Sequence, residues 1–299
     1  MRKIIKILDI DQHYVFFLFG VRLFSLKHKH KNVFPEIKAR GITEQPRSPK
    51  IIISMTSYPL RINSAILSLK TLLNQTVKPD VIMLWLAESQ FPNKAIPGEL
   101  VDLEKYGVTI GWCDDFRSYK KLIPSLKRFP DDIIITVDDD ICYASDTVAV
   151  LYNSYLKHPQ NVHANRCGRV KIYNGCLKNV PTCYLYDKEL SDASFFNRLT
   201  GHAGVLYPPH VFSDTVFDDF MNILPTHDDV WFWGMLVLNG VKTQIVKGFK
   251  ESVYPIENTQ HTGLCKANHK DSSNGISIDE AYAIMVQRYP HILQKLSQD

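Results

Sequence analysis

Four short apolar runs beyond Lys50 constrain the fold more than any other feature of the sequence. They cover residues 51–55 (IIISM), 81–86 (VIMLWL), 108–112 (VTIGW) and 133–137 (IIITV). Runs of this length and composition are typical of strands buried on both faces. The segments 62–74, 119–128 and 147–157 have apolar residues at helical spacing, and Pro124 must either kink the second or lie in its first turn. This alternation predicts an α/β fold with a mostly parallel central sheet.

The remainder of the chain is less regular. Beyond residue 157, short runs are separated by Gly, Pro and Asn, which predicts mixed strands and loops added to the same sheet. We find no internal boundary and expect one domain over residues 48–299. A chain of 299 residues that is 45% hydrophobic can bury a substantial core, which excludes a disordered protein. The net charge of +4 comes from mixed charges without a basic stripe, so no nucleic-acid partner is expected.

Residues 1–47 form a separate N-terminal leader in this interpretation. Residues 14–26 (YVFFLFGVRLFSL) are apolar and aromatic, and a basic cluster, KHKHK, follows at residues 27–31. The run is shorter than the roughly 20 residues of a spanning helix, and no small-residue cleavage site follows it. We expect a helix that either associates with a membrane surface or packs on the main domain, followed by a proline-containing linker. This places the protein in the cytoplasm, either free or peripheral on the inner face of the membrane.

The six cysteines include no CxxC pair, which argues against a thiolate zinc site. In a long chain without a secretory signal, we expect them to be free thiols.

An acidic triplet, Asp138–Asp140, directly follows the apolar run 133–137. Three adjacent carboxylates at the end of a buried strand are costly to desolvate, and a divalent cation with oxygen ligands would relieve that cost. If the segment is extended, Asp138 and Asp140 point to one side and Asp139 to the other. The alternative is a solvated acidic turn or the N-terminus of a helix. The position after an all-apolar strand favours the metal site.

A second acidic pair, Asp228 and Asp229, directly precedes a helical run at residues 230–238. One of these carboxylates is either the N-cap of that helix or a general base that takes a proton from a hydroxyl nucleophile.

The acidic triplet also lies within a family resemblance. The sequence VDDDI at a strand end resembles the DxD motif of GT-A-fold, nucleotide-sugar-dependent glycosyltransferases. Four ordered segments resemble bacterial members that build capsule and O-antigen: SMTSYPLRI (54–62), SYKKLIPSLKRFPDDIIITVDDDICY (118–143), GHAGVLYPP (201–209) and PTHDDVWFWGM (225–235). The resemblance spans about residues 50–270. A single DxD is weakly specific, whereas the ordered set of four is much more so.

The resemblance implies a role for each candidate residue. Asp138 and Asp140 would hold Mn²⁺ or Mg²⁺, with Asp140 the more direct ligand and either His261 or His269 as a third ligand. Asp229 would be the general base, and Asp228 would contact acceptor hydroxyls. The nucleotide sugar would contact residues after the strands and in the small-residue loop: Thr56, Tyr58, Arg61, Lys120, Lys121, Asp138, Asp139 and Gly204. For most of these a structural alternative stays open: the lysines as surface residues, the glycine as a turn, and Trp231 and Trp233 as core rather than as sugar platforms.

The expected function is that of a metal-dependent, inverting glycosyltransferase. It would move a sugar from a nucleotide sugar, a UDP-sugar by default, to a glycan or lipid-linked saccharide acceptor. A sugar-nucleotide pyrophosphorylase-like nucleotidyltransferase is the alternative enzyme, but MTSYPLR lacks the glycine-rich loop expected of that class. A catalytically inactive sugar-binding protein would be expected to lose one acidic motif, and both are present.

Overall fold

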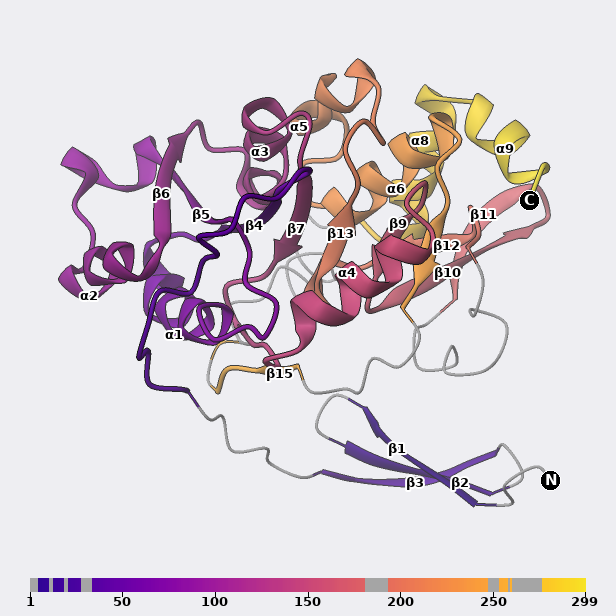
Figure 1. The fold of residues 1–299 in the computed structure, drawn as a ribbon. Coiled ribbons are helices and arrows are strands. Elements are labelled where there is room, and N and C mark those ends of the chain that lie inside the picture. The colour runs from indigo at the N-terminus through magenta and orange to yellow at the C-terminus, as the bar shows by residue number, and fades with distance from the viewer. Residues whose placement is uncertain are drawn as a thin grey trace.

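A seven-stranded sheet forms the centre of the computed structural model (Figure 1). The structure describes residues 5–10, 13–18, 21–27, 34–180, 193–246, 253–257, 259 and 276–299. In spatial order the strands are β14 (Thr243–Ile245), β9 (Val162–Ala164), β13 (Val205–Tyr207), β7 (Ile133–Val137), β4 (Ile51–Thr56), β5 (Val81–Ala87) and β6 (Val108–Cys113). Strands β7, β4, β5 and β6 are parallel, and β13 is antiparallel to both β7 and β9. The expected mostly parallel α/β sheet is therefore confirmed.

Helices cover both faces of this sheet. Their bounds are α1 (Ile62–Leu72), α2 (Gly98–Asp102), α3 (Ile123–Arg128), α4 (Thr147–Lys157), α5 (Phe220–Ile223), α6 (Asp228–Leu238), α8 (Ile278–Arg288) and α9 (His291–Leu296). Short 3-10 helices are η1 (Pro59–Arg61), η2 (Glu88–Gln90), η3 (Pro92–Lys94), η4 (Leu103–Tyr106), η5 (Arg117–Lys121), η8 (Gly201–Ala203) and η9 (Asp214–Phe217). Pro124 is the second residue of α3 and lies in its first turn, so it does not kink this helix.

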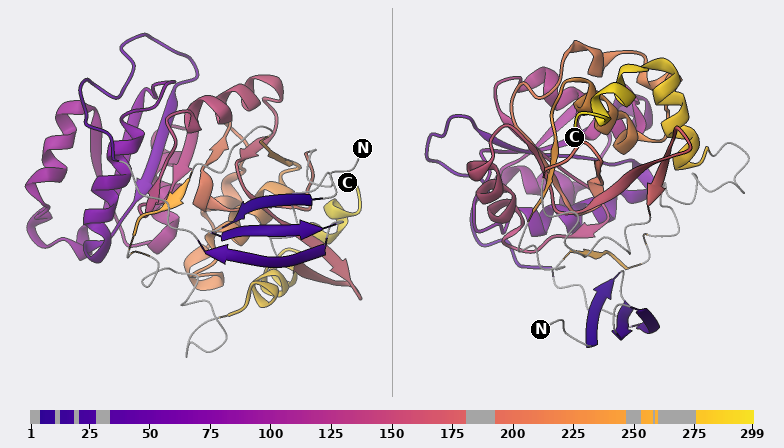
Figure 2. Two further views of the ribbon diagram at one scale, coloured as in Figure 1. Left: turned by 90° about the horizontal axis from the view of Figure 1, so that it is seen from below. Right: turned by 90° about the vertical axis from the view of Figure 1, so that its right-hand side faces the viewer.

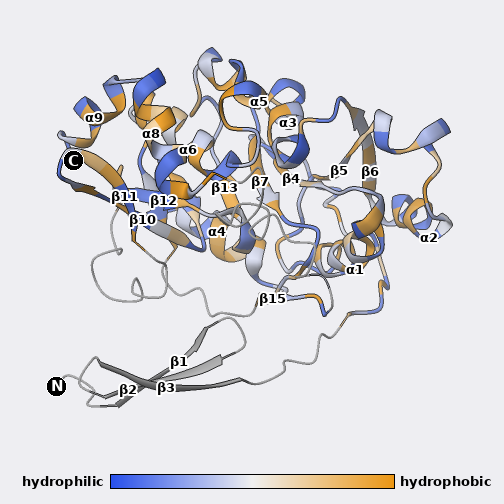
Figure 3. Ribbon diagram, turned by 180° about the vertical axis from the view of Figure 1, so that it is seen from behind, coloured by the Kyte–Doolittle hydropathy of each residue, from blue (hydrophilic) through white to orange (hydrophobic). Residues whose placement is uncertain are grey.

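Alternating side chains of each central strand enter two separate hydrophobic clusters. Ile51, Ile53 and Met55 pack with α1 and α4, whereas Ile52 packs with α3, α6 and α8 on the opposite face. Figure 1 shows α1 and α4 below the sheet and α3 and α6 above it. In Figure 3 hydrophobic residues concentrate in the sheet and on the helix sides that face it. Burial on both faces explains why these strands are apolar at every position.

Two smaller sheets extend the second half of the domain. One contains β11 (Cys176–Val180), β10 (Cys167–Tyr173) and β12 (Asn197–Leu199), all antiparallel. The other pairs β8 (Ile141–Cys142), directly after the acidic triplet, with β15 (Tyr254–Pro255). The expected mixture of strands and loops in this half is confirmed.

The expected N-terminal helix is wrong. The structure has a three-stranded antiparallel sheet of β1 (Ile5–Ile10), β2 (His13–Leu18) and β3 (Val21–Lys27), which shares no strand pairing with the central sheet (Figure 2). Aromatic and β-branched residues dominate this segment, and such residues favour strands over helices. The division at residues 47 and 48, and contact of the leader with a membrane, stay predictions. No helix in the described part of the chain has the length and apolar character needed to span a bilayer.

The linker that follows is attached to the domain. The backbone N–H of Gly41 donates to Tyr106 O at 2.8 Å, and that of Thr43 donates to Pro79 O at 2.8 Å. Four of the six cysteines lie in described positions, and Cys113, Cys142, Cys167 and Cys176 are all free thiols, as expected.

Candidate active site

The polar residues predicted from the sequence converge at the carboxyl edge of the parallel strands. Asp138–Asp140 follow β7, and Ser57–Arg61 follow the neighbouring strand β4. Because parallel neighbours end at the same edge, these two segments are brought together. Lys121 at the end of η5 and Asp228 at the start of α6 join them through ion pairs.

The acidic triplet is a turn and not an extended strand. Strand β7 ends at Val137, and Asp139 and Asp140 lie in a turn. The Arg61 guanidinium therefore reaches two neighbours, with its Nη1 3.0 Å from Asp139 Oδ1 and 3.2 Å from Asp140 Oδ2. Ser57 Oγ donates a 2.6 Å hydrogen bond to Asp139 Oδ2. The expected alternation, with Asp139 alone facing away, is wrong because the chain turns directly after the strand.

Burial sets the protonation behaviour of this turn. It raises the pKa of Asp139 to about 6, although Arg61 and Ser57 act to lower it. Burial also raises the pKa of Asp140, together with repulsion from Asp138, against the opposing effect of Arg61.

Lys121 connects the two acidic motifs. Its Nζ lies 3.0 Å from Asp138 Oδ1 and 3.1 Å from Asp228 Oδ2, and its side chain is only 9% exposed. Burial alone would lower the pKa of Lys121, but Asp138, Asp228 and Asp229 raise it well above the ordinary value, so the ammonium stays charged. In return, Lys121 holds the pKa of Asp138 below its usual range in spite of burial. The sequence offered no signal for this link, since the two motifs are about ninety residues apart.

Asp229 lies in the first turn of α6 beside the same cluster, and its side chain is 29% exposed. Its Oδ1 accepts a hydrogen bond from the backbone N–H of Gly201 at 3.1 Å, and its Oδ2 lies 3.8 Å from Arg198 Nη1. Burial and the neighbouring Asp228 raise the pKa of Asp229 to about 6, while Lys121 and Arg198 act to lower it. The N-cap of α6 is His227, and both aspartates lie in the first turn, so the N-cap interpretation of this pair is wrong.

Asp138 and Asp140 together provide enough carboxylate oxygens, of the type that divalent cations prefer, to hold such an ion. Asp138 and Asp140 supply the hard oxygen ligands that Mg²⁺ and Mn²⁺ prefer, and Mg²⁺ is commonly held by one or two carboxylates plus substrate phosphates. A carboxylate offers about four lone-pair sites, so the ion pairs with Lys121 and Arg61 do not exhaust either group. Within the described residues no group of three or more His, Cys, Asp or Glu side chains is placed to hold a metal. His261 and His269, the candidate third ligands, lie outside the described residues.

The other residues predicted to bind the donor differ in their burial and in their hydrogen-bond partners. Thr56 Oγ1 donates to Trp85 O at 2.9 Å, and Tyr58 is half-buried beside Arg61 at the start of η1. Lys120 is buried and pairs with Asp115 at 2.7 Å, so neither lysine is a surface residue. Gly204 has a φ of +96° in the turn before β13, which is the structural alternative for this glycine.

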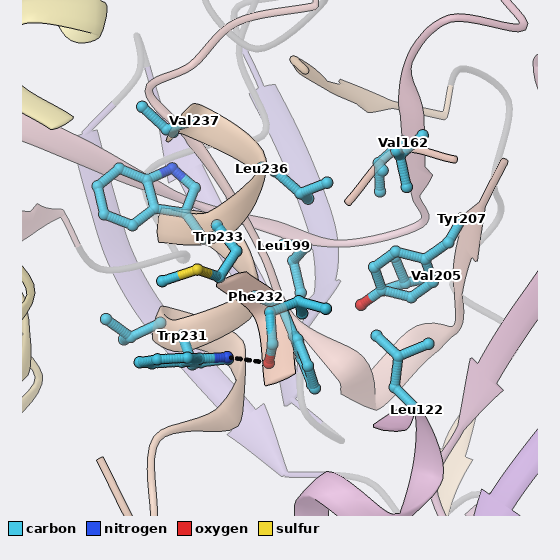
Figure 4. Packing of buried hydrophobic residues seen from close by; sticks show 14 of the residues in the cluster. Leu122, Val162, Leu199, Val205, Tyr207, Trp231, Phe232, Trp233, Leu236 and Val237 are labelled. Atoms are coloured by element: carbon cyan, nitrogen blue, oxygen red, sulfur yellow. Dashed lines mark hydrogen bonds between the residues drawn. The ribbon is translucent and has the colours of Figure 1, made fainter. Parts of the chain in front are cut away.

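Neither tryptophan of α6 faces the site. Trp231 and Trp233 are at most 1% exposed, and their Nε1 atoms donate to Val216 O at 3.1 Å and Phe195 O at 2.7 Å. Figure 4 shows both rings packed among core residues such as Phe232 and Leu236. The proposal that they form a sugar platform is therefore wrong, and both belong to the core.

The sequence did not identify several residues of the cluster. Gly201 makes the closest approach, because a Cβ at this position would lie 2.6 Å from Lys121 Nζ and 3.5 Å from Asp229 Oδ1. Tyr143 Oη accepts from the Asp138 backbone N–H at 2.7 Å. Ser57, Gly201 and Tyr143 lie within the four segments that resemble glycosyltransferase motifs, and that position could have indicated them as site residues. Arg198 lies outside those segments, so no sequence pattern indicated it.

The sheet order and the edge site define a GT-A-like fold. Among solved structures, residues 1–349 of S. aureus TarS in complex with UDP-GlcNAc match with a TM-score of 0.50 and 14% identity, over 83% of this chain and 71% of that one. The mannosyltransferase PcManGT from Pyrobaculum calidifontis, in complex with GDP-Man and Mn²⁺, matches with a TM-score of 0.46 and 12% identity, over 88% and 76%. No protein-family model matches the chain, and no curated protein is significantly similar to it in sequence. The likeness to TarS supports the fold.

Proposed function

We propose that this protein is a metal-dependent, inverting glycosyltransferase that uses a nucleotide sugar. The observation that carries the proposal is the buried cluster in which Lys121 joins Asp138 of the DxD-like turn to Asp228 of the second acidic pair. A purely structural acidic turn would not need a second pair of carboxylates at the same edge. The TarS structure with this fold contains UDP-GlcNAc, so a UDP-sugar is the donor to test first.

Asp229 is the proposed general base. A base works best when its pKa lies near the working pH, and burial brings the pKa of Asp229 to about 6. The Gly201 N–H and Arg198 hold this carboxylate in one orientation. It would take the proton from an acceptor hydroxyl as the oxygen attacks the anomeric carbon, and the bond to the nucleoside diphosphate breaks on the opposite side. One displacement inverts the anomeric configuration.

The donor side would be formed by Asp138 and Asp140, which would hold the cation. When bound, a divalent ion supplies Lewis-acid neutralisation of the departing diphosphate. Lys121 fixes Asp138 toward the second acidic pair, and Arg61 fixes Asp139 and Asp140. Lys121 therefore serves the donor indirectly in this proposal and need not touch a phosphate. The acceptor class, a glycan or lipid-linked saccharide of surface polysaccharide biosynthesis, rests on the resemblance of the four motif segments.

The direct test measures nucleoside diphosphate release from a panel of UDP- and GDP-sugars, with and without Mn²⁺, together with the anomeric configuration of the product by NMR. We expect Mn²⁺-dependent release from at least one UDP-sugar and an inverted product. Asp229→Asn should still bind that donor but transfer at least about a hundredfold more slowly, as is typical of losing a general base. A retained configuration, or normal transfer by Asp229→Asn, would remove Asp229 from this role.

A further inference from the structure

We propose that Arg61 is an internal counter-ion of the acidic turn, Asp138–Asp140, and that it moves to the donor diphosphate when the donor binds. This inference rests on the proposed glycosyltransferase function and assigns a regulation to that same site. Arg61 ends η1, the turn that follows β4, and its Nη1 lies 3.0 Å from Asp139 Oδ1 and 3.2 Å from Asp140 Oδ2. Because Asp140 is also a proposed ligand of the divalent cation, Arg61 and that cation compete for one carboxylate.

The negative charge of the acidic turn is already largely balanced by the protein's own cations. The three carboxylates of the turn pair with Arg61 and with Lys121. The side chains of Arg61, Asp139 and Asp140 are at most 12% exposed, and charges interact more strongly where water is largely excluded. The Arg61 guanidinium would therefore repel a divalent cation at Asp140, and such a cation should bind weakly in the absence of nucleotide.

Of the two cations, Arg61 is the one placed to leave the turn. Lys121 Nζ is held between one carboxylate of each acidic motif, and the space beside it is narrow, since a Cβ on Gly201 would lie 2.6 Å from this nitrogen. Arg61 instead extends from a turn at the surface, where the preceding Leu60 is 82% exposed. We therefore expect Lys121 to keep the two acidic motifs together while Arg61 exchanges partners.

The guanidinium of Arg61 suits a diphosphate better than it suits the acidic turn. Its closest approach to both carboxylates is made by the same nitrogen, Nη1, whereas the strongest arginine contacts use two parallel N–H donors. Its Nη2 lies 3.4 Å from Thr259 O, which is long for a hydrogen bond. Phosphate oxygens accept a guanidinium in the two-donor arrangement. Because Arg61 follows β4 at the edge where sheets of this kind bind ligands, we expect the donor diphosphate to become its partner there.

The test measures Mn²⁺ binding without nucleotide, by the EPR signal of free Mn²⁺, and UDP binding by calorimetry in EDTA. Arg61→Met removes the guanidinium, and Arg61→Gln removes its charge but keeps a hydrogen-bond donor for Asp139. We expect both variants to bind Mn²⁺ at least about tenfold more tightly than the wild type, because one like charge leaves a largely buried site. Both should bind UDP at least about tenfold more weakly, because the diphosphate loses a charged partner.

Arg40→Met is the matched control, since Arg40 forms an exposed ion pair with Glu44 in the linker, at the opposite edge of the sheet. It should bind Mn²⁺ and UDP like the wild type. Mn²⁺ binding by the Arg61 variants that is no tighter than that of the wild type, unchanged UDP binding, or failure of both variants to fold by circular dichroism would each overturn the exchange of partners. If the wild type released diphosphate from no nucleotide sugar, the proposed function would fail instead, while the Mn²⁺ measurement would still report the competition with Arg61.

Discussion

At the scale of single residues, the protonation state of Asp229 should control the rate. Its pKa is raised to about 6, so the carboxylate loses its ability to accept a proton as the pH falls through that value. The rate should be constant above about pH 7 and should fall close to tenfold for each further pH unit below about 6. The measurement is kcat/KM for sugar transfer between pH 5 and 8.

Asp139 has a pKa near the same value, so it needs a separate control. If Asp229 is the titrating group, Asp139→Asn should keep the acid limb even though its overall rate is lower. A rate that stays constant down to pH 5 in the wild type would contradict the assignment of Asp229 as base.

Lys121 makes a second prediction at this scale, on stability. Lys121→Met would leave the buried Asp228 and the partly buried Asp138 without their shared cation, and breaking a buried pair typically costs about 3–5 kcal/mol. Urea unfolding at pH 7 measures this change. The matched control is Lys70→Met, which removes the Lys70–Glu99 ion pair with Glu99 61% exposed, and such pairs are worth about 0–1 kcal/mol. Equal effects of the two substitutions would show that Lys121 does not hold the cluster together.

At the scale of elements, the short helix η8 contacts both Asp229, the proposed base, and Lys121, which bridges the two acidic motifs. Gly201 donates its N–H to Asp229 and leaves room for Lys121 Nζ, which a Cβ would approach to 2.6 Å. The lysine tip is flexible in itself, but two ion pairs hold it in place. Gly201→Ala should therefore displace the ammonium and lower the transfer rate at least about tenfold, which corresponds to about 1.4 kcal/mol.

The control for this substitution is Gly98→Ala at the start of α2, where an added Cβ meets nothing within 4 Å. It should leave both the melting temperature and the transfer rate close to wild type. A Gly201→Ala enzyme with the full rate would show that the packing of η8 against Lys121 is irrelevant to catalysis.

The elements that could be predicted from the sequence are those whose buried residues follow a regular pattern along the chain. Strand β7 and helix α4 begin and end at the predicted residues, because a strand buried on both faces is apolar throughout and an amphipathic helix repeats regularly. Strand β13 has only three residues, and nothing in three residues indicates that it runs antiparallel between β7 and β9. The length of the N-terminal apolar run predicts a helix, but its aromatic and β-branched residues favour the strands that the structure has.

The site could be predicted only in part, for a related reason. Asp138–Asp140 and Asp228–Asp229 are local motifs, so the sequence reveals each of them. Their connection through Lys121, and the contact of Arg198 with Asp229, are tertiary contacts between segments far apart in the chain. Local pattern carries no information about such contacts, which is why a lysine expected at the surface or on a phosphate is buried between carboxylates.

At the scale of the whole molecule, the sheet separates two hydrophobic clusters and leaves its carboxyl edge polar. Carboxylates gather at that edge, while the opposite edge anchors the linker through Gly41 and Thr43. This arrangement explains how a group of charges is tolerated at that edge: Lys121, Arg61 and Arg198 pair with the carboxylates, and the remaining acidic excess is what the proposed divalent cation would neutralise.

The most direct test of this account is the binding of UDP-sugars measured by calorimetry, in Mn²⁺ and in EDTA, for the wild type and for Asp140→Ala. We expect the wild type to bind at least one UDP-sugar at least about tenfold more tightly in Mn²⁺ than in EDTA. Asp140→Ala should lose that difference while it keeps the wild-type fold by circular dichroism. Wild-type binding that is absent for every UDP-sugar, or an unchanged Mn²⁺ effect in Asp140→Ala, would contradict the assignment of this edge as a metal-dependent nucleotide-sugar site.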